Sequence, residues 1–141
     1  MFTSEQDYIV ISQDALRIFQ QSEESNRTRA ERVAIEKISG YLRSKYDVDK
    51  IFAATGDERN SMILLCVIDI SLYHLNSWLP QKMGHDIREE RYKEAIDYLT
   101  DIQKGTIIPN LPLTGEDSST SSSTDTGSIL ASGMSPSKYD Y

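Results

Sequence analysis

The chain has 141 residues, with 22 acidic and 15 basic side chains and a net charge of −7. This length suits one domain and is short for two. An acidic chain is repelled by nucleic-acid phosphates unless its bases cluster on one face, so nucleic acid is a poor default partner. One cysteine, Cys66, excludes an internal disulfide, and its place in an apolar run predicts a small buried hydrophobe.

The N-terminal region is predicted to hold one short helix. The opening MFTSEQDYIVIS lacks the basic start and long apolar stretch of a signal peptide, so we expect a soluble protein that stays where it is made. Residues 8–11 form a brief β-branched run, which predicts either a short strand or an extended lead-in. Ser12 can cap a first helix, and residues 20–27 have loop composition. The apolar face of this helix comprises Ala15, Leu16, Ile18 and Phe19.

A second helix is predicted from the pair Thr28 and Glu31, which form a capping box. Apolar residues then repeat every four positions, which indicates a surface helix with one buried face. The repeat consists of Ala30, Ala34, Ile38, Leu42 and Tyr46, with Ile35 widening the stripe. Gly40 lies inside this helix, where glycine costs about 1 kcal/mol relative to alanine. We interpret it as a close approach of a neighbouring helix, with a functional glycine as the alternative.

The third predicted helix, residues 59–79, is the most informative segment. Its stretch 62–68 is apolar on every side, and such a helix must be buried by other helices or by a partner. Asp69 and Asn76 lie seven residues apart and so share one face, where they form a narrow polar strip. A membrane span needs about 18 or more uninterrupted apolar residues, and this segment is interrupted, so we predict a core helix.

Two segments flank this third predicted helix. Residues 47–58 are predicted as a loop with an apolar anchor at Ile51 and Phe52, and Asp57 can cap the helix that follows. Pro80 ends that helix, because proline cannot continue it.

The fourth predicted helix opens with the capping pair Asp86 and Glu89, runs to about Lys104 and ends at Gly105. Its apolar positions keep helical spacing: Ile87, Tyr92, Ala95, Ile96, Leu99 and Ile102. Residues 106–113 follow as an extended strap, since Pro109 and Pro112 keep their predecessors out of the helical region.

The C-terminal tail is rich in serine and threonine. Residues 118–128 hold six serines and three threonines, and such a segment cannot offset its ordering entropy by its own contacts. We therefore predict that the apolar residues beyond it bind a partner, with an undocked flexible tail as the alternative. These predicted partner-binding residues are Ile129, Leu130, Met134, Tyr139 and Tyr141.

The sequence contains no recognisable catalytic motif or metal-binding pattern. Cys66, Asp69 and His74 stand at i, i+3 and i+8, which scatters them around a helix instead of directing them at one metal ion. Asp47 imitates the start of a calcium loop, but Ile51 occupies a ligand position. GxSxG, HExxH and a glycine-rich phosphate loop are lacking. We predict no catalytic, cofactor-binding or metal-binding residues, and no enzyme activity.

The expected fold is all-α: a small four-helix bundle over residues 1–110, with an extended Pro/Ser/Thr-rich strap and tail over 111–141. The tail segment holds four acids and one lysine, which leaves a net charge of −4 on the bundle.

Three segments in order, AIEKISGYLRSKYDV, LLCVIDISLYHL and EERYKEAIDYLTDIQKGTI, resemble the small head–tail adaptor (connector, or head-completion) proteins of Mu-like tailed phages. The match covers about residues 5–110. The matching residues are Tyr41, Leu42, Lys45 and Tyr46, then Asp69, Ile70 and Tyr73, then Tyr92, Ala95, Leu99 and Gly105. Relatives often carry a proline soon after the basic-tyrosine pair, whereas this chain has Asp47-Val48-Asp49, and the long tail lies outside the pattern.

The resemblance implies a structural protein of the virion, made in the host cytoplasm and located at the head–tail interface. Such adaptors form a homo-oligomeric ring, commonly of twelve copies, which binds the portal protein, extends the DNA channel and receives the stopper or tail-completion protein. Genomic DNA passes without sequence-specific binding, and no membrane or cofactor is involved. The family has no known catalytic residues. Two alternatives stay open: a small phage helical protein that regulates or binds host factors, and a nucleic-acid binder using the arginines of residues 27–43.

Overall fold

A computed structural model describes residues 2–79 and 85–115 of the chain. This part is mostly helical, with six α-helices and no β-sheet, which confirms the predicted fold class. The α-helices are α1 (Glu5–Ile11), α2 (Gln13–Gln21), α3 (Glu24–Leu42), α4 (Val48–Ala53), α5 (Ser61–Trp78) and α6 (His85–Lys104), and a 3₁₀ turn, η1, covers Gly56–Glu58. The prediction of four helices is two short, because α1 and α4 were expected to be non-helical.

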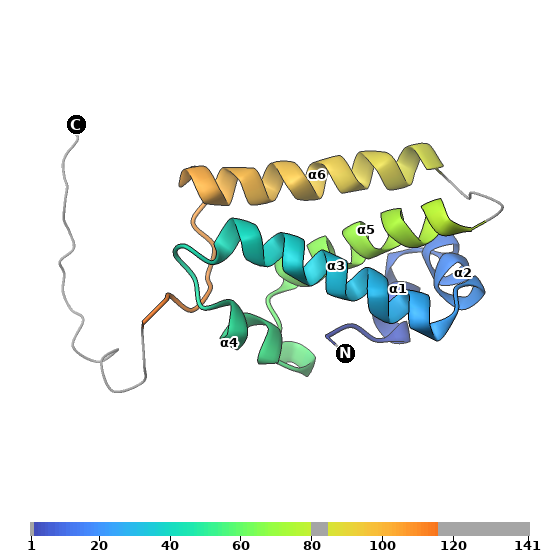
Figure 1. Ribbon diagram of the computed structural model, residues 1–141, viewed down its shortest axis with the longest axis horizontal. Coiled ribbons are helices and arrows are strands. Elements are labelled where there is room, and N and C mark those ends of the chain that lie inside the picture. Colours follow the sequence, from blue (N-terminus) through green and yellow to red (C-terminus); the bar gives the residue numbers. More distant parts are fainter. Residues whose placement is uncertain (1, 80–84, 116–141) are drawn as a thin grey trace.

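Helix α5 occupies the centre of the molecule. It packs against α3, α6 and α2, while α3 also contacts α6 and α4, and α1 contacts α2 (Figure 1). Ten of its 18 residues are buried. Within the described ranges, α5 is the one helix long and apolar enough to cross a bilayer by length and composition, and here just over half of it is buried against the rest of the molecule. The predicted core helix is therefore observed.

The core has two parts, one toward each end of α5. The first joins α5 to α3 and α6 through residues such as Ile38, Ile63 and Leu99. The second joins α5 to α1 and α2, with Ile18 and Leu72 fully buried. Burying a side chain of this size contributes about 1.5–3 kcal/mol, so the two parts together supply the main stabilisation.

Residues 8–11 belong to a helix, so both predictions made for them, strand and extended lead-in, are wrong. Helix α1 begins after Ser4, whose backbone N–H donates to the Asp7 carboxylate at 2.8 Å. This local cap outweighs the weak β preference of a run of four residues. The prediction for Ser12 is confirmed, because its hydroxyl accepts from the Ala15 N–H at 3.1 Å and caps α2.

The capping box predicted for Thr28 and Glu31 is also wrong. Helix α3 begins at Glu24, four residues earlier, so Thr28 lies inside it. Glu31 instead holds the N-terminal segment: its carboxylate accepts from the N–H of Phe2 at 2.7 Å, from the N–H of Thr3 at 3.1 Å, and from the Thr3 hydroxyl. Buried backbone donors need such partners, which explains a buried glutamate on the inner face of a helix.

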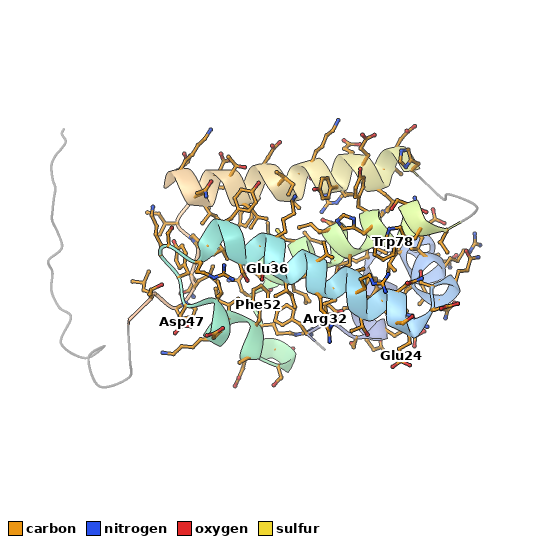
Figure 2. The ribbon with its side chains drawn as sticks, in the orientation of Figure 1. Glu24, Arg32, Glu36, Asp47, Phe52 and Trp78 are labelled. Atoms are coloured by element: carbon orange, nitrogen blue, oxygen red, sulfur yellow. The ribbon has the colours of Figure 1, made fainter. Side chains whose placement is uncertain are left out.

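Gly40 is exposed, and a Cβ added there would meet nothing within 4 Å, so the predicted close approach of a neighbouring helix is wrong. The loop predicted for 47–58 contains α4, which Asp47 caps by accepting from the Lys50 N–H at 3.2 Å. The apolar anchor is observed, with Ile51 buried and the Phe52 ring edge-on to Phe2. Figure 2 shows Phe52 between α4 and α3.

The third and fourth predicted helices, which correspond to α5 and α6, differ from the structure in their first turns. Asn60, and not Asp57, caps α5 by accepting from the N–H groups of its second and third residues at 3.0 and 3.1 Å. Asp86 lies within the first turn of α6 and does not precede it, so the predicted capping pair is wrong. Ile87 is 55% exposed, unlike the other apolar positions of that helix.

The C-terminal end of α6 follows the prediction. Gly105 has φ +87°, and the Thr106 N–H then donates to the Asp101 carbonyl at 2.9 Å, which closes the last turn. The strap that follows returns to the α3–α4 turn, where the Thr114 N–H donates to the Lys45 carbonyl at 3.0 Å and the Asp47 N–H to the Pro112 carbonyl at 2.8 Å.

We expect Glu31→Ala to lower the free energy of unfolding by about 3 kcal/mol, because two buried backbone donors lose charge-assisted hydrogen bonds. Urea denaturation measures this loss. Glu36→Ala is the matched control on the same helix, since Glu36 is exposed and lies 3.7 Å from Arg43 in a surface ion pair; its effect should stay below about 0.5 kcal/mol. Equal effects of the two substitutions would contradict the assignment.

Candidate functional site: an apolar groove

A groove of about 290 Å³ opens on the surface between α1 and the first half of α5. Five of its seven lining residues are aliphatic. The lining comprises Asp7, Val10, Ile11, Ser61, Leu64, Leu65 and Ile68. Its chemistry is that of a surface that receives apolar side chains, since a concave apolar lining with few polar groups characterises binding sites.

The wall formed by α1 is fixed from its other side. Tyr8 is buried, with its ring centroid 4.6 Å from that of Phe19 on α2. Successive helical residues are rotated by about 100°, so the residues after Tyr8 turn away from the core. Ile9 is accordingly 45% exposed and Val10 81% exposed. An aliphatic side chain with four-fifths of its area in water is left at the edge of the groove.

An ion pair fixes α1 to the start of α5. The Arg59 guanidinium donates to both carboxylate oxygens of Asp7, at 2.9 and 3.1 Å, and also to the carbonyls of Phe2 and Gly56. Burial raises the pKa of Asp7, but the hydrogen bonds from Arg59 and the Ser4 N–H outweigh it and hold that pKa below 3.8. The charged residue of the groove lining is therefore ionised and already paired.

Some exposed apolar side chains belong to the two helices that form this groove. The described ranges hold eight large hydrophobic residues with substantial exposure: Ile9, Val10, Val33, Met62, Trp78, Ile87, Ile108 and Leu113. Three of them, Ile9, Val10 and Met62, belong to α1 and to the first turn of α5. Contiguous exposed apolar area on a folded domain marks an interaction surface.

Both residues of the polar strip predicted on α5, Asp69 and Asn76, are buried, and Asp69 is paired with α6. The Asp69 carboxylate accepts from the Arg91 guanidinium at 3.1 Å, while burial raises the pKa of Asp69 and the charge of Arg91 opposes that rise. Asp69 Oδ1 and Arg88 Nη1 are buried without a hydrogen-bond partner among the described residues. Such a pair contributes little net stability.

The remaining chemistry-bearing residues of α5 do not converge. Burial raises the pKa of the Cys66 thiol to about 12, which keeps it protonated and unreactive. Burial, reinforced by the charge of Lys37, lowers the pKa of His74. Within residues 2–79 and 85–115, no three His, Cys, Asp or Glu side chains gather as metal ligands.

The five residues predicted to bind a partner, Ile129, Leu130, Met134, Tyr139 and Tyr141, lie outside the described residues. Sequence reasoning missed the groove, because one of its walls is a helix that was expected to be a strand or a lead-in. The signal was present in Ser4 and Asp7, whose S-x-x-D spacing is a capping pattern.

Comparison of the chain with protein-family models gives no match, and comparisons with curated proteins and with solved structures give none either.

We expect Arg59→Ala to lower the free energy of unfolding by about 2 kcal/mol at pH 7, because it leaves the partly buried Asp7 carboxylate unpaired. The folded-state pKa of Asp7 lies below its unfolded value of 3.8, so its stabilisation is complete above that value and is lost as the pH falls through the folded-state pKa. The difference between wild type and variant should therefore shrink below about pH 4.

Urea titrations between about pH 2.5 and 7 measure this difference. Arg43→Ala is the control, since Arg43 is 59% exposed and pairs with Glu36 only at 3.7 Å. A difference for Arg59→Ala that stays constant over the whole pH range would show that the Asp7 charge plays no part.

Proposed function

We propose that this chain is a structural virion protein, a head–tail connector (adaptor) subunit that forms a ring below the portal, extends the DNA channel and joins capsid to tail. The observation that carries the proposal is the open apolar groove of α1 and α5, since a rigid helical body with an uncovered apolar surface calls for a protein partner. The assignment to a phage connector rests on the sequence resemblance.

Residues of the three motifs that carry the resemblance contact one another or share one core cluster, which supports the proposal. Tyr73 of the second motif and Tyr92 of the third stack at a centroid distance of 4.2 Å across α5 and α6. Leu99 of the third motif belongs to the same buried cluster as Leu42 and Tyr46 of the first. The three motifs thus describe one packed unit.

The first motif also receives the strap. Tyr46 forms an isolated antiparallel bridge with Leu113, and the Lys45 carbonyl accepts from Thr114. We therefore propose a helical adaptor domain over residues 1–110, with the segment 111–141 as an extended tail whose first residues lie on that domain.

Ring formation follows from contacts between unlike surfaces. A head-to-tail contact between different patches of neighbouring copies closes into a ring when the rotation allows it. Twelve copies, as in the family that the sequence resembles, form the proposed ring, which is contacted by the portal on one side and by the stopper or tail-completion protein on the other. The net charge of −4 on residues 1–110 suits passage of DNA, since phosphates are repelled and do not adhere.

Light scattering with and without the cognate portal protein tests the proposal. A connector subunit should form a complex with portal, whereas the alternative, a helical regulator that binds host factors, should show no affinity for it. Failure to bind portal at micromolar concentration would remove the connector assignment.

Deleting residues 116–141 should leave the helical body folded but reduce assembly on portal at least about ten-fold, because tails that lie across neighbours raise effective concentration. The deletion keeps Thr114, whose N–H donates a hydrogen bond to the Lys45 carbonyl in the turn between α3 and α4. Circular dichroism checks the fold, and particle counting by electron microscopy measures assembly.

A matched variant keeps the tail at full length but replaces three of its apolar residues: I129S, L130S and M134S. The same loss of assembly is expected from it. If the truncated chain assembles as efficiently as the full chain, the tail has no role in assembly.

A further inference from the structure

We propose that the groove between α1 and α5 binds residues 129–134 from the tail of a neighbouring copy. This inference rests on the proposed function, because it identifies the contact that links the subunits of the ring. Among the described residues, this groove has aliphatic side chains on both of its walls. The segment that follows Gly115 contains large aliphatic residues that could fill it.

The chemistry of the two surfaces corresponds. Between Asp125 and Lys138 the sequence carries no charged residue, and this uncharged stretch contains Ile129, Leu130 and Met134. Burying an unpaired charge in an apolar groove is costly, so a segment without charges suits a lining whose single carboxylate, Asp7, is already paired with Arg59. Aliphatic side chains from the tail gain about 25 cal/mol for each Å² removed from water.

One charge of the tail, on Lys138, is opposite in sign to the charges of α1. Helix α1 carries two acids, Glu5 and Asp7, and no base. Glu5 is exposed on this helix and accepts from the Gln20 side chain at 3.1 Å. Lys138 follows the apolar stretch of the tail by four residues and is opposite in sign to these two acids, whereas Asp125 precedes Ile129 by four residues.

The length of the tail permits the contact. Ile129 is 14 residues beyond Gly115, which allows a span of at most about 50 Å in an extended chain. Helix α6, with 20 residues, is about 30 Å long. A tail of this length is long enough to extend past its own helical body, so its length permits contact with an adjacent copy.

The places of the exit and the groove favour a neighbour over the same copy. The strap leaves α6 at the end of the bundle where α3 turns into α4, whereas α1 and α2 lie toward the opposite end (Figure 1). The strap and the groove are unlike surfaces, and contacts between unlike surfaces link copies head to tail. Binding the neighbour's groove thus joins successive subunits.

Disulfide trapping between two single-substitution variants of the full chain tests the proposal. Val10→Cys places a thiol at the groove edge, where the native side chain is 81% exposed, and Leu130→Cys places one in the tail. The native Cys66 stays silent because it is buried. Mixing the variants under mild oxidation should give a covalent dimer that neither variant forms alone with the same yield.

Ile87→Cys is the matched control, since Ile87 is a 55% exposed apolar residue of α6 that does not line the groove. The mixture of Val10→Cys with Leu130→Cys should give at least about ten times more dimer than the mixture of Ile87→Cys with Leu130→Cys. Equal yields would overturn the proposal. So would a Val10→Cys/Leu130→Cys double variant that closes only within one chain.

The mass of the wild-type complex with portal separates this inference from the proposed function. If wild type binds portal but Leu130→Cys does not crosslink to Val10→Cys, the docking is wrong and the connector role stands. If the two variants crosslink while wild type ignores portal, the docking stands and the connector role is wrong. If neither is observed, both are overturned.

Discussion

The fold depends on the need to bury α5 on all sides. A helix that presents Ile63, Val67, Ile70 and Leu72 around its circumference gains stability only when other elements surround it. The long helices α3 and α6 cover two of its sides, and the small pair α1 and α2 covers a third near its C-terminal half. That coverage stops short along the first half of α5. The groove is one part of α5 that this chain leaves accessible, and Met62 and Trp78 are exposed elsewhere on the same helix.

The N-terminal contacts determine the shape of that groove. Glu31 holds Phe2 and Thr3, Arg59 holds Asp7, and both contacts bring α1 against the body of the protein. The charged groups of Glu31 and Arg59 hold the N-terminal segment in place, because they satisfy backbone donors and acceptors that packing alone would leave without partners. The groove is thus a consequence of how the first residues of the chain are held, which is why a local cap at Ser4 matters for a surface far along the sequence.

The sequence predicted the elements that are long and periodic, and it missed the short ones. Helix α5, the stripe from Ala30 to Leu42 and the stop at Gly105 were predictable, because each combines many apolar positions or a glycine with φ +87°. Helices α1 and α4 have seven and six residues, so caps and tertiary contacts decide their conformation and periodicity does not. Glu31 was misread as a local cap partner, because its true partners lie 28 and 29 residues away. One wall of the groove is α1, so the groove could not be predicted from a sequence analysis that did not predict α1.

The central claim is that copies of this chain cover one another's apolar surface at α1 and α5. Sedimentation of the full wild-type chain and of Val10→Asp, each with and without portal protein, tests it most directly, since a charge at an exposed position should leave the 16.0 kDa subunit folded. The account predicts that wild type forms a complex of several subunits on portal and that Val10→Asp stays a folded monomer. A wild-type chain that remains monomeric with portal, or a Val10→Asp chain that assembles to the same size, would contradict it.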